Sequence, residues 1–153
     1  MAHFIDERCD GCSACAHQCP TEAISGRRGE LYTVAPELCI DCNVCGWICH
    51  VEAVLDERGE RIARRRRPER PRPLIDVDRC NGCGLCVDFC PFDCLTLIGP
   101  RFQGVVMLDA PGACVACSDC AAVCIKDAIV MGPLDLRDYD VEAVAERLRR
   151  VVE

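Results

Sequence analysis

Short apolar segments recur along the chain, separated by turns rich in glycine, aspartate and cysteine. Most hold β-branched or aromatic residues and are too short for a helix, so the pattern predicts strands. A glycine turn between 24–25 and 31–34 predicts a hairpin. The strands are expected at 2–5, 24–25, 31–34, 54–55, 74–77, 95–98, 104–108 and 129–131, with short helices at 16–23 and 46–53.

Between these segments, cysteines recur in four runs with the spacing C-x2-C-x2-C-x3-C. The runs fall into two pairs, because the second and third are further apart than the others and an arginine–proline segment lies between them. The chain is therefore predicted to have two modules at 1–57 and 74–133, a linker at 58–73 and a C-terminal segment at 134–153. The runs are Cys9/Cys12/Cys15/Cys19, Cys39/Cys42/Cys45/Cys49, Cys80/Cys83/Cys86/Cys90 and Cys114/Cys117/Cys120/Cys124.

The cysteine content, 17 of 153 residues, is open to three interpretations. A disulfide scaffold is disfavoured by the regular repeats, the odd total and the absence of secretory-signal features in residues 1–7. A zinc-binding interaction module is the remote alternative, but zinc sites usually separate two C-x2-C pairs by a loop. Sixteen thiolates in four runs instead match four [4Fe–4S] clusters.

The runs, with Pro20 and Pro91 after two of them, resemble those of the bacterial-type two-cluster ferredoxin, twice over. The resemblance implies an α+β fold in which each module is a pseudo-twofold pair of βαβ halves around two clusters. It also implies crossed ligation, in which the fourth cysteine of each run binds the partner run's cluster. The implied ligand sets are Cys9, Cys12, Cys15 and Cys49; Cys39, Cys42, Cys45 and Cys19; Cys80, Cys83, Cys86 and Cys124; and Cys114, Cys117, Cys120 and Cys90.

Three residues depart from the repeat. His50 and Ile125 stand where proline follows the other runs, and His50 is open to two interpretations: a donor to a cluster sulfur, or a surface histidine. Cys94, the seventeenth cysteine, occupies a position that is alanine in the other copies, at 23, 53 and 128. We expect it to be a small buried hydrophobic residue beside a cluster rather than a ligand.

The linker and the C-terminal segment lie outside the repeat. Residues 58–73 combine a run of four arginines with prolines, so they are expected to form either a solvated connector or a strap that docks on an acidic surface. Residues 140–153 are expected to form a helix that begins at Asp140, with an apolar face that covers the modules or binds another subunit. That face comprises Val141, Val144, Leu148, Val151 and Val152.

Charge and chemistry narrow the function. The net charge of −7 disfavours nucleic acid as a partner, and no apolar run is long enough to span a membrane. No catalytic arrangement is apparent, and clusters with four thiolates leave no iron open to substrate. We therefore expect a cytoplasmic electron-transfer protein rather than an enzyme, most simply the wiring subunit of an oxidoreductase complex.

The chain resembles the four-cluster small subunits of tungsten- or molybdenum-containing aldehyde oxidoreductases, in which repeated subunits can build longer assemblies. The alternative is a free low-potential carrier.

Overall fold

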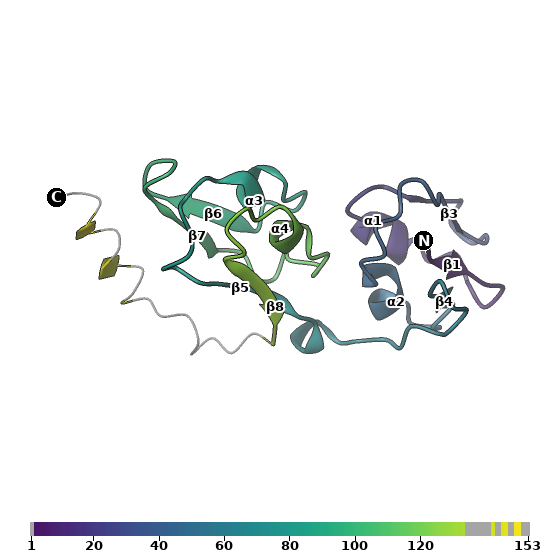
Figure 1. Cartoon of the computed structure of the whole chain (residues 1–153). Helices are drawn as coiled ribbons and strands as arrows, with labels where there is room; N and C mark the ends of the chain where they lie inside the picture. Colours follow the sequence, from purple (N-terminus) through teal and green to yellow (C-terminus); the bar gives the residue numbers. More distant parts are fainter. Residues whose placement is uncertain (1, 134–141, 143–144, 147–148, 151–153) are drawn as a thin grey trace. The chain divides into compact units, whose positions relative to one another are not determined.

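The structure is a computed structural model of the 153-residue chain. It describes residues 2–133, 142, 145–146 and 149–150. The chain divides into two compact units, unit 1 at Met1–Arg70 and unit 2 at Pro71–Glu153 (Figure 1). Each unit combines short helices with short antiparallel strands, so the coarse expectation of a small mixed α and β fold is confirmed.

Unit 1 contains two sheets of two strands each. Strand β1 pairs with β4 and β2 pairs with β3, both antiparallel. Two-residue strands are marginal alone, so their stability depends on packing against the rest of the unit. In chain order the elements are β1 (Phe4–Ile5), α1 (Ala14–Gln18), β2 (Ile24–Ser25), β3 (Thr33–Val34), α2 (Val44–Ile48) and β4 (Val54–Leu55).

Unit 2 repeats this order with longer strands. Strand β5 pairs with β8 and β6 with β7, again as two antiparallel pairs. The β-branched and leucine residues of β6 and β7 account for the extra length, because they pack well on a pleated surface. The elements are β5 (Arg72–Ile75), α3 (Leu85–Asp88), β6 (Leu95–Ile98), β7 (Val105–Leu108), α4 (Asp119–Ala122) and β8 (Ile129–Gly132).

The helices of unit 1 begin and end earlier than predicted. They were expected at 16–23 and 46–53, but α1 is Ala14–Gln18 and α2 is Val44–Ile48. The fourth cysteine of each run, Cys19 or Cys49, adopts extended backbone and ends the helix. For Cys19 the following proline explains this ending, since a residue before proline disfavours helical backbone.

The cores are small and contain cysteine. In unit 1 the buried cluster consists of Ile24, Tyr32, Cys45 and Val54. In unit 2 it is larger and combines three buried cysteines with aliphatic residues of β6, β7 and β8. A unit of this size buries too little apolar surface to be stable alone, so whatever the cysteines bind must contribute to folding.

Residues 58–70 belong to unit 1 and residues 71–73 to unit 2, and several of them have contacts within their unit. Ile62 packs against the core of unit 1 and its amide donates to the Val54 carbonyl at 3.0 Å. The Arg65 guanidinium lies 5.1 Å from the centre of the Trp47 ring, and the Arg65 amide donates to the Trp47 carbonyl. Arg70 is buried, and Arg72 already belongs to β5. The arginines at 64–67 are exposed, as expected.

The predicted C-terminal apolar face, Val141, Val144, Leu148, Val151 and Val152, lies outside the described residues. Those that are described between 142 and 150 have helical backbone and exposed side chains, and Glu146 pairs with Arg149 and Arg150, each at 3.3 Å. Within the part of the chain that the structure describes, no helix has the length and apolarity to cross a membrane.

Candidate metal centres

The four cysteine loops share one backbone geometry. In each, the residues immediately before and after the second cysteine have positive φ, between 55° and 79°. Left-handed residues in such close succession turn backbone N–H groups inward and form the concave nests that bind anions at phosphate and iron–sulfur sites. The pairs are Gly11 and Ser13, Asp41 and Asn43, Gly82 and Gly84, and Ala116 and Ser118. The loops are thus shaped to surround an anionic group.

The helices position the third cysteine of each run. The residue after the second cysteine is the N-cap of each helix, so Cys15, Cys45, Cys86 and Cys120 all lie within the first two helical turns. The fourth cysteine follows the last helical residue by one position in unit 1 and by two in unit 2. In each run the third and fourth cysteines therefore lie at opposite ends of one short helix.

A small residue four positions after each fourth cysteine is buried. At three of these positions the backbone amide donates to the cysteine sulfur at 3.3 Å: Ala23 to Cys19, Ala53 to Cys49 and Ala128 to Cys124. N–H donors of this kind stabilise negative charge on a sulfur ligand. The sequence repeat indicated these positions, and the structure gives the reason for them.

Strand pairing places the fourth cysteine of one run near the first cysteine of its partner. Cys9 follows β1 and Cys49 precedes β4, and these two strands are paired through Ile5 and Val54. The second antiparallel pair, β2 with β3, relates Cys19 and Cys39 in the same way. The topology thus favours thiols of different runs meeting at one site.

The thiols gather in the crossed sets. A cavity in unit 1 is lined by Cys19 together with Cys39, Cys42 and Cys45, beside apolar residues that include Val34 and Val44. A cavity in unit 2 is lined by Cys124 together with Cys80, Cys83 and Cys86, beside apolar residues that include Val106 and Ile129. Four thiols in an apolar cavity fit the donor set of a cubane iron–sulfur cluster.

Electrostatic neighbours support the same grouping at the other sites. Burial raises the pKa of Cys15 to about 11, and the charges of Cys9, Cys12 and Cys49 raise it too. Cys15 is thus influenced by two cysteines of its own run and by Cys49 of the other run. In unit 2, burial raises the pKa of Cys120 to about 12, with the charges of Cys114, Cys86 and Cys90 among the further causes.

Burial makes five of the sixteen thiols in the runs poorer acids. It is the largest cause that raises the pKa of Cys86 to about 11 and of Cys117 to about 12, and it also raises the pKa of Cys45. At neutral pH such thiols are protonated unless a cation is bound, and metal binding must release their protons. The raised pKa values of these five thiols fit metal ligands better than reactive free thiolates.

Cys94 is buried and contacts two other thiols. Its sulfur lies 3.3 Å from that of Cys90, and a hydrogen bond from the Cys94 thiol is the largest cause that lowers the pKa of Cys114, to about 6. Burial opposes this shift, while the Ala116 amide and the charge of Arg72 contribute to it. Cys94 thus lies beside two cysteines of one predicted ligand set.

His50 is half exposed, and its Nε2 lies 2.9 Å from Asp10 Oδ2. Asp10 lies between the first two cysteines of the first run and His50 follows Cys49, so this ion pair joins the two runs of unit 1. An exposed pair of this kind contributes little to stability. Of the two interpretations, the contacts match a surface histidine.

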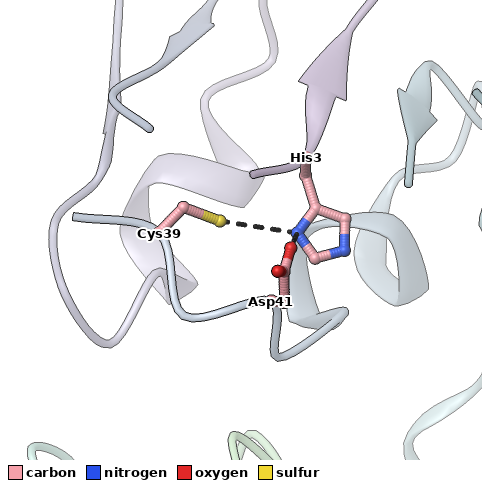
Figure 2. Close-up of side chains that lie close together, drawn as sticks. All are labelled: His3, Cys39 and Asp41. Carbon is pink, nitrogen blue, oxygen red and sulfur yellow. Dashed lines mark hydrogen bonds and ion pairs between the residues drawn. The ribbon is translucent and has the colours of Figure 1, made fainter. Parts of the chain in front are cut away.

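Sequence reasoning missed His3. Its side chain is buried, and its Nδ1 lies 3.5 Å from Cys39 Sγ and 3.4 Å from Asp41 Oδ1 (Figure 2). The only signal in the sequence was a histidine within a predicted apolar strand, 36 positions before its cysteine partner.

Comparisons with known proteins agree with the cysteine pattern. Residues 2–25 and 73–96 each match the 4Fe-4S binding domain family, one segment in each unit. Ferredoxin-3 of a Nostoc species is 29% identical over 75 residues, which cover 40% of this chain and 77% of that protein. Ferredoxin Fdx2 of Sorangium cellulosum is 50% identical over 38 residues, which cover 25% of this chain and 37% of that protein.

Among solved structures, the formate dehydrogenase–heterodisulfide reductase–formylmethanofuran dehydrogenase complex from Methanospirillum hungatei contains a similar chain. The TM-score is 0.43 at 18% identity, and the match covers 95% of this chain and 56% of that one. The chain thus spans little more than half of this longer polypeptide. The two domain matches and the two relatives support a tandem arrangement of 4Fe-4S ferredoxin domains, with one matching domain in each unit.

Proposed function

We propose that this chain is an electron-transfer polyferredoxin with four [4Fe–4S] clusters that serves as the electron-wiring subunit of a larger redox enzyme. The observation that carries the proposal is the grouping of thiols. Two apolar cavities are each lined by three cysteines of one run and the fourth cysteine of its partner run. The repeat extends the same arrangement to the two remaining sets, so that all sixteen cysteines of the runs act as ligands in the crossed order.

Each residue class has a part in this arrangement. When bound, a cluster of this type exchanges one electron with its partners. The cysteines hold the irons as thiolates, and the amides of Ala23, Ala53 and Ala128 donate to three of the ligand sulfurs. Aliphatic residues of the strands line the cavities and exclude water. This exclusion of water adjusts the reduction potential of a bound cluster. The two halves of each unit form a pseudo-twofold pair of βαβ motifs, so that its two sites have related surroundings.

The partner we propose is a catalytic oxidoreductase subunit that donates or accepts the electron, and the chain has no catalytic site of its own. Resemblance in size and cluster number favours a tungsten- or molybdenum-containing aldehyde oxidoreductase. The acidic net charge of −7 favours docking on a basic protein surface and disfavours nucleic acid. Thiolate clusters need a reducing compartment, so we propose a cytoplasmic location without direct membrane insertion.

The test is iron and acid-labile sulfide per chain after anaerobic purification from the native host, with size-exclusion elution of the same sample. We expect about 16 of each, as four cubanes require, and co-elution with a second polypeptide. The same content in a monomer would make the chain a free carrier, and a content near eight would leave two sets without clusters. Zinc in place of iron would refute the electron-transfer function.

A further inference from the structure

His3 is held by three residues of the second cysteine run, although it lies near the start of the chain. Its side chain is only 3% exposed. Nδ1 lies 3.5 Å from Cys39 Sγ and 3.4 Å from Asp41 Oδ1, and Nε2 lies 3.0 Å from Asn43 Oδ1. Figure 2 shows the imidazole with its Nδ1 directed at both the sulfur and the carboxylate. The ring is thus fixed against the loop that supplies three thiols of one site.

The partners determine where the imidazole proton lies. A metal-bound Cys39 thiolate and an ionised Asp41 carboxylate are both acceptors only, so Nδ1 must carry the proton. The side-chain amide of Asn43 satisfies Nε2 in either orientation, because its oxygen accepts and its NH2 group donates. His3 is therefore a donor to the Cys39 sulfur.

A donor at this position favours the reduced state of the site. Reduction adds negative charge, part of which resides on the ligand sulfurs, and hydrogen bonds to the sulfurs raise the reduction potential. The effect is strong because the ring is buried and water screens it little. By comparison, Cys9, the first cysteine of the first run, accepts a hydrogen bond from the Gly11 backbone amide at 3.4 Å. The group beside the Cys9 sulfur is a backbone amide, whereas the group beside the Cys39 sulfur is a side chain that a substitution can remove.

We propose that His3 is a positioning residue that raises the reduction potential of the cluster bound through Cys39. The inference rests on the proposed function, since it requires clusters at these sites. It does not depend on crossed ligation, because Cys39 belongs to the same cluster under either arrangement.

Unit 2 has a related device built from another residue. Pro73 occupies the position of His3, two residues before the isoleucine that pairs with the closing strand, and proline has no donor. The preceding residue, Arg72, is 5% exposed, and its charge acts on Cys114, the first cysteine of the second run in that unit. Both units thus place a buried basic side chain beside the equivalent cysteine.

The test is an anaerobic redox titration of the full-length protein followed by electron paramagnetic resonance. It compares wild type with His3→Leu, which removes the donor, and His3→Gln, which retains an N–H. We expect His3→Leu to lower one midpoint potential, so that at the wild-type midpoint the reduced-to-oxidised ratio falls about tenfold, or about 59 mV for a one-electron couple. His3→Gln should recover most of this loss. The control is His17→Gln, which removes an exposed histidine from α1 of the same unit.

Iron and sulfide are measured on every sample. Full iron with unchanged potentials in His3→Leu would overturn the proposal, as would an equal shift in His17→Gln. Wild-type protein without clusters would instead contradict the proposed function. If His3→Leu loses iron, wild-type protein labelled with ¹⁵N-histidine decides the question. The reduced cluster should show hyperfine coupling to one histidine nitrogen that persists in His17→Gln and disappears in His3→Gln, and its absence would refute the contact.

Discussion

Gly46 provides a direct test of how the arginine-rich segment packs on unit 1. It follows the third cysteine of its run inside α2, where the other helices have Ala16, Val87 and Ala121. A Cβ at Gly46 would overlap Cβ and Cγ2 of Ile62. Ile62 cannot easily move away, because its amide donates to the Val54 carbonyl at 3.0 Å. Glycine is therefore required by a contact from outside the repeat rather than by the backbone.

The magnitudes decide the sign of Gly46→Ala. Alanine in a helix interior is favoured over glycine by about 1 kcal/mol, whereas overpacking of a filled site costs about 1–3 kcal/mol. The substitution should thus destabilise unit 1 by roughly 1 kcal/mol, the balance of these two terms. In an Ile62→Gly background both overlapping atoms, Cβ and Cγ2, are absent, so the same substitution should stabilise by up to about 1 kcal/mol. The sign reversal is the distinctive prediction.

The assay is the rate at which cluster absorbance is lost in denaturant under anaerobic conditions, because unfolding with cluster loss is irreversible and is measured as a rate. Wild type, the two single variants and the double variant form a double-mutant cycle with an expected coupling of about 1–3 kcal/mol. Gly112→Ala is the control, since a Cβ there meets no atom within 4 Å. If Gly46→Ala is equally destabilising with and without the Ile62 side chain, residues 61–65 do not pack on α2 as described.

Three further outcomes are expected. Cys94→Ala should retain all iron while costing about 1 kcal/mol for the small cavity, and loss of about four irons would make Cys94 a ligand. The Arg61 side chain lowers the pKa of Asp6 by a hydrogen bond, so this pair stabilises the fold above the usual Asp pKa of about 3.9 and its effect fades as pH falls through the lowered value. Cluster-loss rates of wild type and Asp6→Asn should therefore differ at neutral pH and converge in acid. Chelation of iron should abolish the far-ultraviolet circular dichroism of both units, and a retained signal would contradict the dependence of folding on metal.

Each of the eight expected strands overlaps an observed one, because strands depend on local pattern, but five have other bounds. The strand expected at 74–77, for example, is Arg72–Ile75. The segments at 24–25, 54–55 and 95–98 have the predicted bounds, since a branched apolar residue follows a buried small one at a fixed distance from the last cysteine. The bounds predicted for the helices were wrong, because helix propensity does not account for the backbone conformation that ends them. Glu22 and Glu52 have positive φ, which turns the next amide towards the cysteine sulfur and stops any helix from extending through them.

The connector was predicted from composition, and composition was a poor guide to its contacts. Arginine and proline favour solvated backbone, and the arginines at 64–67 are indeed exposed. The packing depends on two side chains among them, Ile62 on the core and Arg65 on Trp47. Neither contact can be derived from residues 58–73 alone, because each partner lies in the cysteine repeat.

An internal repeat supplies its own alignment, and the positions where one copy departs from the others indicate non-local contacts. The four copies have the same local structure, so a residue found in one copy alone is explained by a contact outside that copy. Gly46 leaves room for the Ile62 side chain, and the Cys94 thiol contacts that of Cys114. His50, where the first run has proline, pairs with Asp10 of the partner run. His3, where the second unit has proline, lies 3.5 Å from the Cys39 sulfur. Each departure was visible in the sequence, but its partner depends on how the strands of its unit pair.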